Sequence, residues 1–114
     1  PILVVGGSAR TFLGEYMAGG LLLVLALDGA MKAREIGSGI HGGEIVIRGN
    51  VDEACLAAGA KTLPLTDEDR ARIAPVIREF ADDFGLDPEP LVNADYTRIV
   101  PASARPFAGK YTWE

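Results

Sequence analysis

A glycine pair near the start of the chain is the first feature that could do chemistry. Ile2 to Val5 reads as a strand and is followed by Gly6-Gly7-Ser8, a loop that could bind phosphate. Asp28 lies 22 positions after Gly6, near the place of a ribose-binding acid in a dinucleotide site. However, the stretch from Gly6 reads G-G-S-A-R-T, so serine and threonine occupy the second and third glycine positions of that fingerprint. A small dinucleotide-binding enzyme domain that uses the Gly6-Gly7 loop therefore remains the alternative interpretation.

The chain has one histidine and one cysteine, which limits metal and nucleophilic chemistry. His41 lies between Ile40 and Gly42 without a second histidine or a cysteine at metal-ligand spacing, so we predict a structural or partner-contacting imidazole. Cys55 alone can form neither an internal disulfide nor a cluster site, and we expect a small buried hydrophobe there. We predict no catalytic, cofactor-binding or metal-ligating residue.

The charge balance restricts the partners. A net charge of −5 argues against nucleic acid and anionic membranes, which require a basic surface. Because arginine is favoured at protein interfaces, Arg98 and Arg105 are the expected polar contacts to a partner protein. The longest apolar run, Leu21 to Leu27, is far shorter than the ~20 residues that span a bilayer. The expected location is cytoplasmic.

The glycines recur in register over the first half of the chain. Gly14 to Val24 aligns with Gly37 to Ile47 at an offset of 23, and a diglycine precedes an aliphatic stretch in both copies. A truncated copy, Leu3 to Gly6, precedes Leu23 to Ala26 by 20 positions. We predict that these glycines are structural corners: Gly14, Gly19, Gly20, Gly37, Gly39, Gly42, Gly43 and Gly49.

Sharp glycine corners between short aliphatic strands predict a parallel β-solenoid, so the expected fold class is mainly β. The rungs should occupy residues 1–50, with stacked parallel strands at 2–6, 21–26 and 44–48. The strand at 21–26 shows no alternation, which indicates that both of its faces are covered. The strand at 44–48 has charged ends, which indicates one face in water.

Residues 51–114 read as a C-terminal extension packed on the solenoid. A helix is expected at 66–84, with Thr66 as its N-cap, Gly85 as its stop and Pro75 as a kink or a break. Residues 50–62 read either as a short helix or as a degenerate rung, and the chain from Asp95 reads as extended. The apolar stripe of the helix should cover the solenoid; it consists of Ile73, Val76, Ile77, Phe80 and Phe84.

Two segments carry a resemblance to a known family. Gly14-Glu15-Tyr16-Met17-Ala18-Gly19-Gly20 and Gly39-Ile40-His41-Gly42-Gly43-Glu44-Ile45-Val46-Ile47-Arg48-Gly49 resemble the GXGXG repeat of glutamate synthase large subunits, in its stand-alone, archaeal-type form. The proline-containing helix and the tail from Thr97 to Phe107 are similar to the ending of that subfamily. Subunits of formylmethanofuran dehydrogenase and of N-methylglutamate synthase are similar in the glycine-rich part.

The resemblance implies a right-handed β-helix with a structural role in an enzyme that makes glutamate from 2-oxoglutarate and glutamine-derived ammonia. It implies no cofactor on this chain, and it places FMN, an iron–sulfur cluster and NAD(P)H on partner subunits. The expected partners are flavin/iron–sulfur and amidotransferase chains, or further copies of this chain. No catalytic residue of the family maps onto this sequence, so we expect a non-catalytic assembly subunit.

Overall fold

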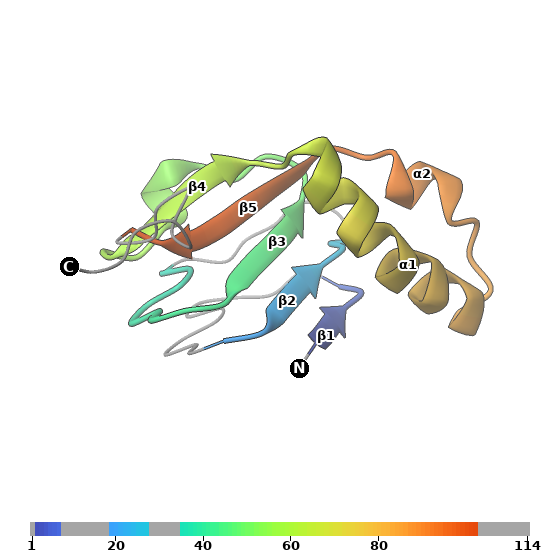
Figure 1. The fold of residues 1–114 in the computed structure, drawn as a ribbon, viewed down its shortest axis with the longest axis horizontal. Helices are drawn as coiled ribbons and strands as arrows, with labels where there is room; N and C mark the ends of the chain where they lie inside the picture. Colours follow the sequence, from blue (N-terminus) through green and yellow to red (C-terminus); the bar gives the residue numbers. More distant parts are fainter. Residues whose placement is uncertain (1, 8–18, 28–34, 103–114) are drawn as a thin grey trace.

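The computed structural model describes residues 2–7, 19–27 and 35–102, which form a mixed α/β domain (Figure 1). One five-stranded sheet has the strand order β1-β2-β3-β5-β4, and two helices lie together on one side of it. None of the described helices has the length and apolar character needed to cross a membrane. The elements in chain order are β1 (Ile2–Val5), β2 (Leu21–Val24), β3 (Glu44–Arg48), a 3-10 turn (Glu53–Cys55), β4 (Ala60–Pro64), α1 (Asp67–Asp83), α2 (Glu89–Val92) and β5 (Tyr96–Pro101).

The three repeat strands pair in parallel, as the glycine pattern predicts. Leu21 of β2 is opposite Glu44 of β3, which confirms the offset of 23. Between β1 and β2 the offset is 19 rather than the predicted 20, because Val4 and not Leu3 is opposite Leu23. Both strands are continuously aliphatic, so no alternation of polar and apolar residues specifies their register.

The solenoid prediction is wrong, because β3 does not continue into a further parallel rung. Its outer edge pairs antiparallel with β5, and β5 pairs antiparallel with β4. The result is an open mixed sheet rather than a right-handed β-helix. Pairing of Arg48 with Tyr96 joins segments 48 positions apart. No local periodicity of the sequence predicts such a contact.

Each face of the sheet has its own hydrophobic core. On one face, α1 and α2 cover Leu21, Leu23 and Val46. On the other, the segments around Ile36 and Leu56 cover the opposite side chains of β2 and β3. Both faces of β2 are therefore covered, as predicted. The prediction that one face of β3 lies in water is wrong, because α1 packs over that face and buries Val46 completely.

Helix α1 begins and ends as the sequence predicts. The Thr66 hydroxyl accepts a hydrogen bond from the Asp69 N–H at 3.1 Å, and the Asp69 carboxylate accepts one from the Thr66 N–H. Gly85 follows the helix with φ +67°, a conformation that favours glycine. The helix runs unbroken through Pro75, so the predicted split does not occur.

The predicted stripe on α1 is only partly buried. Ile73 and Ile77 are buried against the sheet, and Val76 and Phe80 are half-buried. Phe84 is 67% exposed, so its predicted burial is wrong. It lies after the last residue of the helix and stacks on Phe80 with ring centroids 4.6 Å apart.

Residues 50–62 include a short helix, one of the two predicted interpretations, and form no full parallel rung. They contain the 3-10 turn at Glu53–Cys55, followed by the start of β4. A single parallel bridge joins Ile36 to Leu56. Cys55 is half-buried and packs against the second core, so it is less buried than expected.

The two diglycine turns contact each other where β2 and β3 begin. Gly20 and Gly43 have φ of +82° and +74°, as the corner prediction requires. A Cβ built on Gly43 would lie 2.6 Å from the carbonyl carbon of Gly19, so only glycine fits at this position. The Glu44 N–H donates to the Gly20 oxygen at 3.0 Å and starts the β2–β3 pairing.

We predict that Gly43→Ala destabilises the fold by more than its positive φ alone would cause. The left-handed conformation costs about 1–2 kcal/mol for a residue with a Cβ, and the contact with the Gly19 backbone adds to this. Gly59→Ala is the matched control, because Gly59 has φ +88° but open space around the position of its Cβ. Urea unfolding of both variants measures the difference, and equal losses would contradict the proposed contact.

Candidate functional site

The outer edge of β1 is the most distinctive surface of the described residues. Among the described strands, β1 is terminal in the sheet order and β2 is its neighbour. The Val5 oxygen accepts a hydrogen bond from the Leu25 N–H at 2.9 Å, so the backbone polar groups of Val5 point toward β2. Because these groups alternate along a strand, the N–H and C=O of Val4 point outward, away from β2. The edge can therefore accept another strand.

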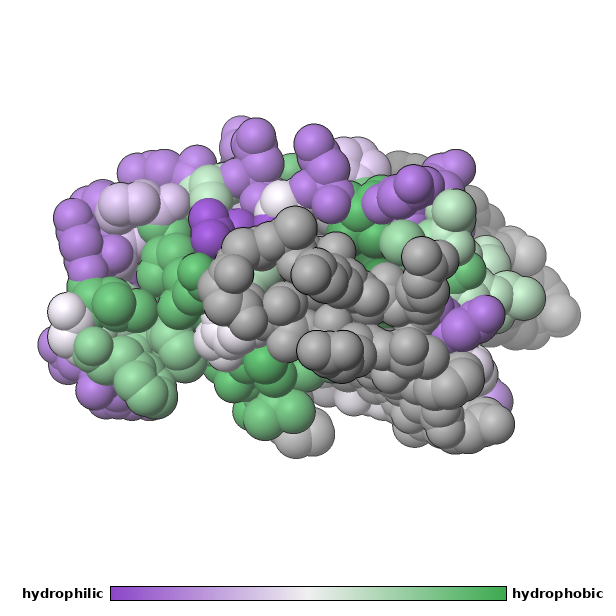
Figure 2. Space-filling view, turned by 180° about the vertical axis from the view of Figure 1, so that it is seen from behind, coloured by the Kyte–Doolittle hydropathy of each residue, from purple (hydrophilic) through white to green (hydrophobic). Residues whose placement is uncertain are grey.

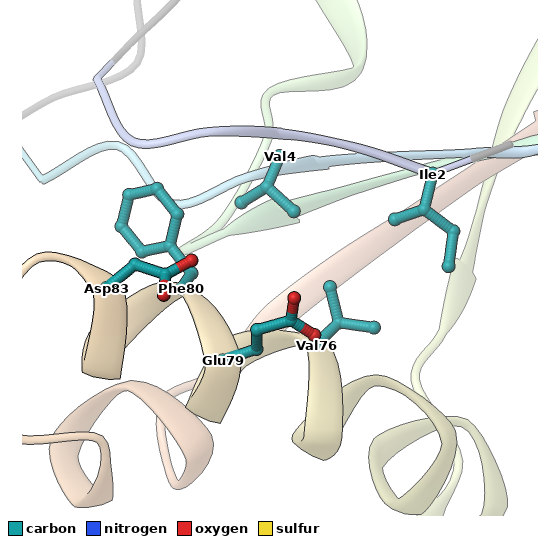
Figure 3. Close-up of a pocket in the computed structure, with 6 residues that line it drawn as sticks. All are labelled: Ile2, Val4, Val76, Glu79, Phe80 and Asp83. Atoms are coloured by element: carbon teal, nitrogen blue, oxygen red, sulfur yellow. The ribbon is translucent and has the colours of Figure 1, made fainter.

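A groove of about 300 Å³ lies between this strand and α1. Ile2 and Val4 point toward the helix, and two carboxylates, Glu79 and Asp83, reach up from the helix toward the strand (Figure 3). The Phe80 ring closes one end against Gly6, where an added Cβ would lie 2.8 Å from Cζ. We call this the edge groove; its lining residues are Ile2, Val4, Val76, Glu79, Phe80 and Asp83.

Exposed hydrophobic side chains lie on β1 and after the end of α1. Ile2 and Leu3 are 60% and 61% exposed, although they belong to a strand. Seen from behind, hydrophobic surface lies over the side of the molecule where β1 and the end of α1 are located (Figure 2). Leu27, whose N–H donates to the Gly6 oxygen, lies beside β1. The large hydrophobics exposed among the described residues are Ile2, Leu3, Leu27, Phe84 and Leu86. Exposed apolar side chains on an edge strand are typical of an interaction site.

The opposite edge of the sheet, formed by β4, has a different character. Its sequence, Ala60-Lys61-Thr62-Leu63-Pro64, contains a lysine and ends in a proline. Both residue types discourage strand addition at a sheet edge. In contrast, β1 has neither a charged residue nor a proline. Of the two edges in the described sheet, the β1 edge is therefore the one without the usual protection against pairing.

A cluster of four charged side chains lies near the start of α1. Arg72 binds the Glu44 carboxylate at 2.8 Å and that of Asp69 at 3.2 Å, and Arg98 lies 3.5 Å from Glu44. Burial acts to raise the pKa of Asp69, but hydrogen bonds from Thr66 and Arg72 outweigh it and hold the pKa below its ordinary value. The pKa of Arg72 is raised, chiefly by its hydrogen bond to Glu44. These four charges tie α1 to β3 and β5.

Tyr96 is part of the helix-side core rather than of a polar site. Its hydroxyl donates to the Leu91 oxygen at 2.6 Å, and burial raises its pKa to about 12. Arg70 donates to the oxygens of Val92 and Ala94 at 2.8 and 2.7 Å. Together these bonds connect the end of α2 to α1 and β5.

The structure places the predicted site residues in separate regions. Gly37, Gly39 and Gly49 also have positive φ, like the diglycine members Gly20 and Gly43. His41 is exposed before β3, so its role as a partner contact stays a prediction. Arg98 is half-buried beside Glu44. Gly14, Arg105, Asp28 and the predicted dinucleotide helix at 9–18 lie outside the described residues.

The edge groove is not evident from the sequence, although Ile2-Leu3-Val4-Val5 reads as a strand. The exposure of this strand depends on which strands pair with it, and only the tertiary structure shows that pairing. Within the described ranges, no group of three or more His, Cys, Asp or Glu side chains is placed to hold a metal ion. Gly6 of the expected phosphate loop lies under the Phe80 ring.

Comparison with known proteins gives a relative but no family. No protein-family model matches the chain. The uncharacterized protein MJ1350 of Methanocaldococcus jannaschii is 48% identical over 122 aligned positions, which cover 98% of this chain. The chain spans only 46% of the length of that relative.

The two stacked phenylalanines provide a test of the groove. Phe80→Ala should destabilise the fold by about 2–3 kcal/mol, less than a fully buried ring but enough to report its packing on Gly6. Phe84→Ala should cost at most about 1 kcal/mol, because that ring is exposed and loses only the stacking contact. Urea unfolding at pH 7 measures both. Similar losses for the two variants would mean that Phe80 does not close the groove.

The lowered pKa of Asp69 predicts a pH-dependent contribution to stability. A carboxyl group with a lowered folded-state pKa stabilises above its ordinary value of 3.8 and loses that effect as the pH falls through the folded-state value. Asp69→Asn should therefore lower the free energy of unfolding by about 0.5–1 kcal/mol at pH 7, and the difference from the wild type should shrink below pH 3.8.

Asp67→Asn is the control for Asp69→Asn, because Asp67 shares the first turn of α1 but is exposed. Asp67 is also not part of the ion-pair cluster around Arg72. Unfolding curves at several pH values compare the two variants. A pH-independent loss for Asp69→Asn would contradict the ion-pair account.

Proposed function

We propose that this chain is a non-catalytic assembly module of a glutamate synthase-like oxidoreductase complex. In this proposal the chain extends its sheet onto a partner chain through the β1 edge. FMN, the iron–sulfur cluster and the NAD(P)H site belong to partner subunits, and the complex works in the cytoplasm.

The observation that carries the proposal is the unprotected edge of β1. An aliphatic strand with outward-pointing backbone groups and exposed side chains on both faces is costly for an isolated protein. A partner strand would satisfy the backbone groups and cover the apolar surface at the same time. The charged and proline-terminated β4 edge makes such pairing specific to one side of the sheet.

The glycine pattern supports a structural role for the motif that resembles the GXGXG repeat. Gly20 and Gly43 have left-handed backbone conformations, and Gly43 also lies against the Gly19 backbone. The turns that lead into the paired strands β2 and β3 therefore account by themselves for glycine at these positions. The host complex is inferred from the resemblance of the glycine pattern, and the relative from M. jannaschii, of which less than half is aligned, adds no activity to it.

The dinucleotide alternative receives less support. In a phosphate loop, glycine lets the backbone approach the pyrophosphate closely. Here Gly6 instead lets the Phe80 ring approach the backbone, with only 2.8 Å between that ring and an added Cβ. The glycine at this position is accounted for by helix–strand packing.

Co-expression tests the proposed function. The full chain is produced with a flavin/iron–sulfur chain and an amidotransferase chain of the glutamate synthase type, and the mass of the purified assembly is measured. We expect a stable complex that forms glutamate from glutamine and 2-oxoglutarate, while the chain alone is colourless and inactive. The interface should bury more than ~1,000 Å². A chain that turns over these substrates or a nicotinamide cofactor by itself would overturn the proposal.

A further inference from the structure

We infer that the edge groove binds a β-strand of a second polypeptide that carries lysine or arginine among aliphatic residues. This inference deepens the proposed function, on which it rests for the existence of a partner, by stating the chemistry of the segment that β1 receives. The strand would pair with the outward backbone groups of Val4 and lie over the groove between β1 and α1.

Backbone geometry defines where the strand would bind. Val5 directs its polar groups to β2, so Val4 directs its own N–H and C=O to the open side. The side chains of Ile2 and Val4 face α1 and form one wall of the groove, while Leu3 is exposed on the opposite face. An added strand would thus have aliphatic contacts on both faces of the sheet.

The groove is acidic, which determines the charge of the occupant. Glu79 and Asp83 are one helical turn apart on α1, and both line the groove. Among the described residues neither carboxylate has an ion-pair partner, whereas the other lining residues are apolar. A lysine or arginine on the incoming strand would neutralise these charges as the groove loses its water.

The same charges disfavour a second copy of this chain as the occupant. Pairing of β1 with β1 across a two-fold axis would present the same groove from both sides. Two copies of the Glu79 and Asp83 carboxylates would then lie close together, and none of the described groove-lining residues supplies a compensating cation. Like charges across an interface select against that arrangement.

Designed strand peptides test the inference on the full chain. The probes are fluorescein-labelled nine-residue peptides of alternating valine and lysine, or of alternating valine and glutamate, with N-methyl groups along one edge to prevent self-association. Fluorescence anisotropy should show binding of the lysine peptide and at least roughly ten-fold weaker binding of the glutamate peptide. Equal affinities, or no binding of either peptide, would overturn the inference.

Variants locate the binding site. Glu79→Gln with Asp83→Asn should weaken binding of the lysine peptide roughly three- to ten-fold, since two surface charge pairs are lost. Glu68→Gln with Asp82→Asn is the control, because it changes the net charge equally at exposed positions of the same helix outside the groove, and should leave the affinity unchanged. Equal effects of the two double variants would overturn the charge assignment.

Val4→Pro removes an N–H that points away from β2, so it should abolish peptide binding without breaking the β1–β2 pairing. If that variant does not fold, as judged by circular dichroism, Leu3→Lys serves in its place, because Leu3 is exposed and lysine protects a strand edge. Undiminished binding by the folded variant would overturn the inference. So would a dimer of the wild-type chain that the same substitution dissociates, since a second copy would then be the occupant.

The outcome is separable from that of the proposed function. If the co-expressed complex forms and survives both Val4→Pro and the Glu79/Asp83 double variant, the groove inference and attachment through the β1 edge are wrong, while membership of the complex stands. If the peptides bind as expected but no complex forms with glutamate synthase-type chains, the groove inference stands and the proposed host is wrong.

Discussion

The contact between the two diglycine turns is the constraint on which the sheet depends. Gly43 lies so close to the Gly19 backbone that no side chain fits between them, and the Glu44 N–H binds the Gly20 oxygen. This contact fixes Leu21 opposite Glu44. Because a shift of one residue would exchange the two faces of a strand, it also determines which side chains enter each core. Leu23 and Val46 thereby meet α1, while Ile45 and Ile47 meet the opposite core.

The C-terminal part of the chain uses one edge of the parallel strands and leaves the other free. β5 pairs antiparallel with β3 and carries Tyr96, whose hydroxyl binds α2, and Arg98, which lies beside Glu44. The parallel ladder consequently ends at β3. At β1, by contrast, the ladder ends in an aliphatic strand beside an acidic helix face. The asymmetry between the two edges is the physical basis of the assembly proposal.

Burial and charge divide the surface of α1 into regions with different roles. Its first turn is held by the Thr66 cap and by the ion pairs of Arg72 with Glu44 and Asp69. Its middle buries Ile73 and Ile77, and its last turns carry Glu79, Phe80 and Asp83 along the edge groove. The helix thus stabilises the fold at one end and forms a wall of the candidate site at the other.

The sequence by itself determined the local elements. Left-handed turns need glycine, helix starts need a cap, and apolar runs form strands or stripes, so the parallel repeat strands, the Thr66 cap and the Gly85 stop were predictable from residue types and spacing. Only the tertiary structure decided that the sheet is open and mixed, that Phe84 lies in water, and that β1 is an exposed edge. The physical reason is that both the backbone hydrogen bonds between β3 and β5 and the hydrophobic packing of α1 on β1 join segments that are far apart in the sequence. Local residue spacing encodes a strand, but it does not encode which strand will be its neighbour.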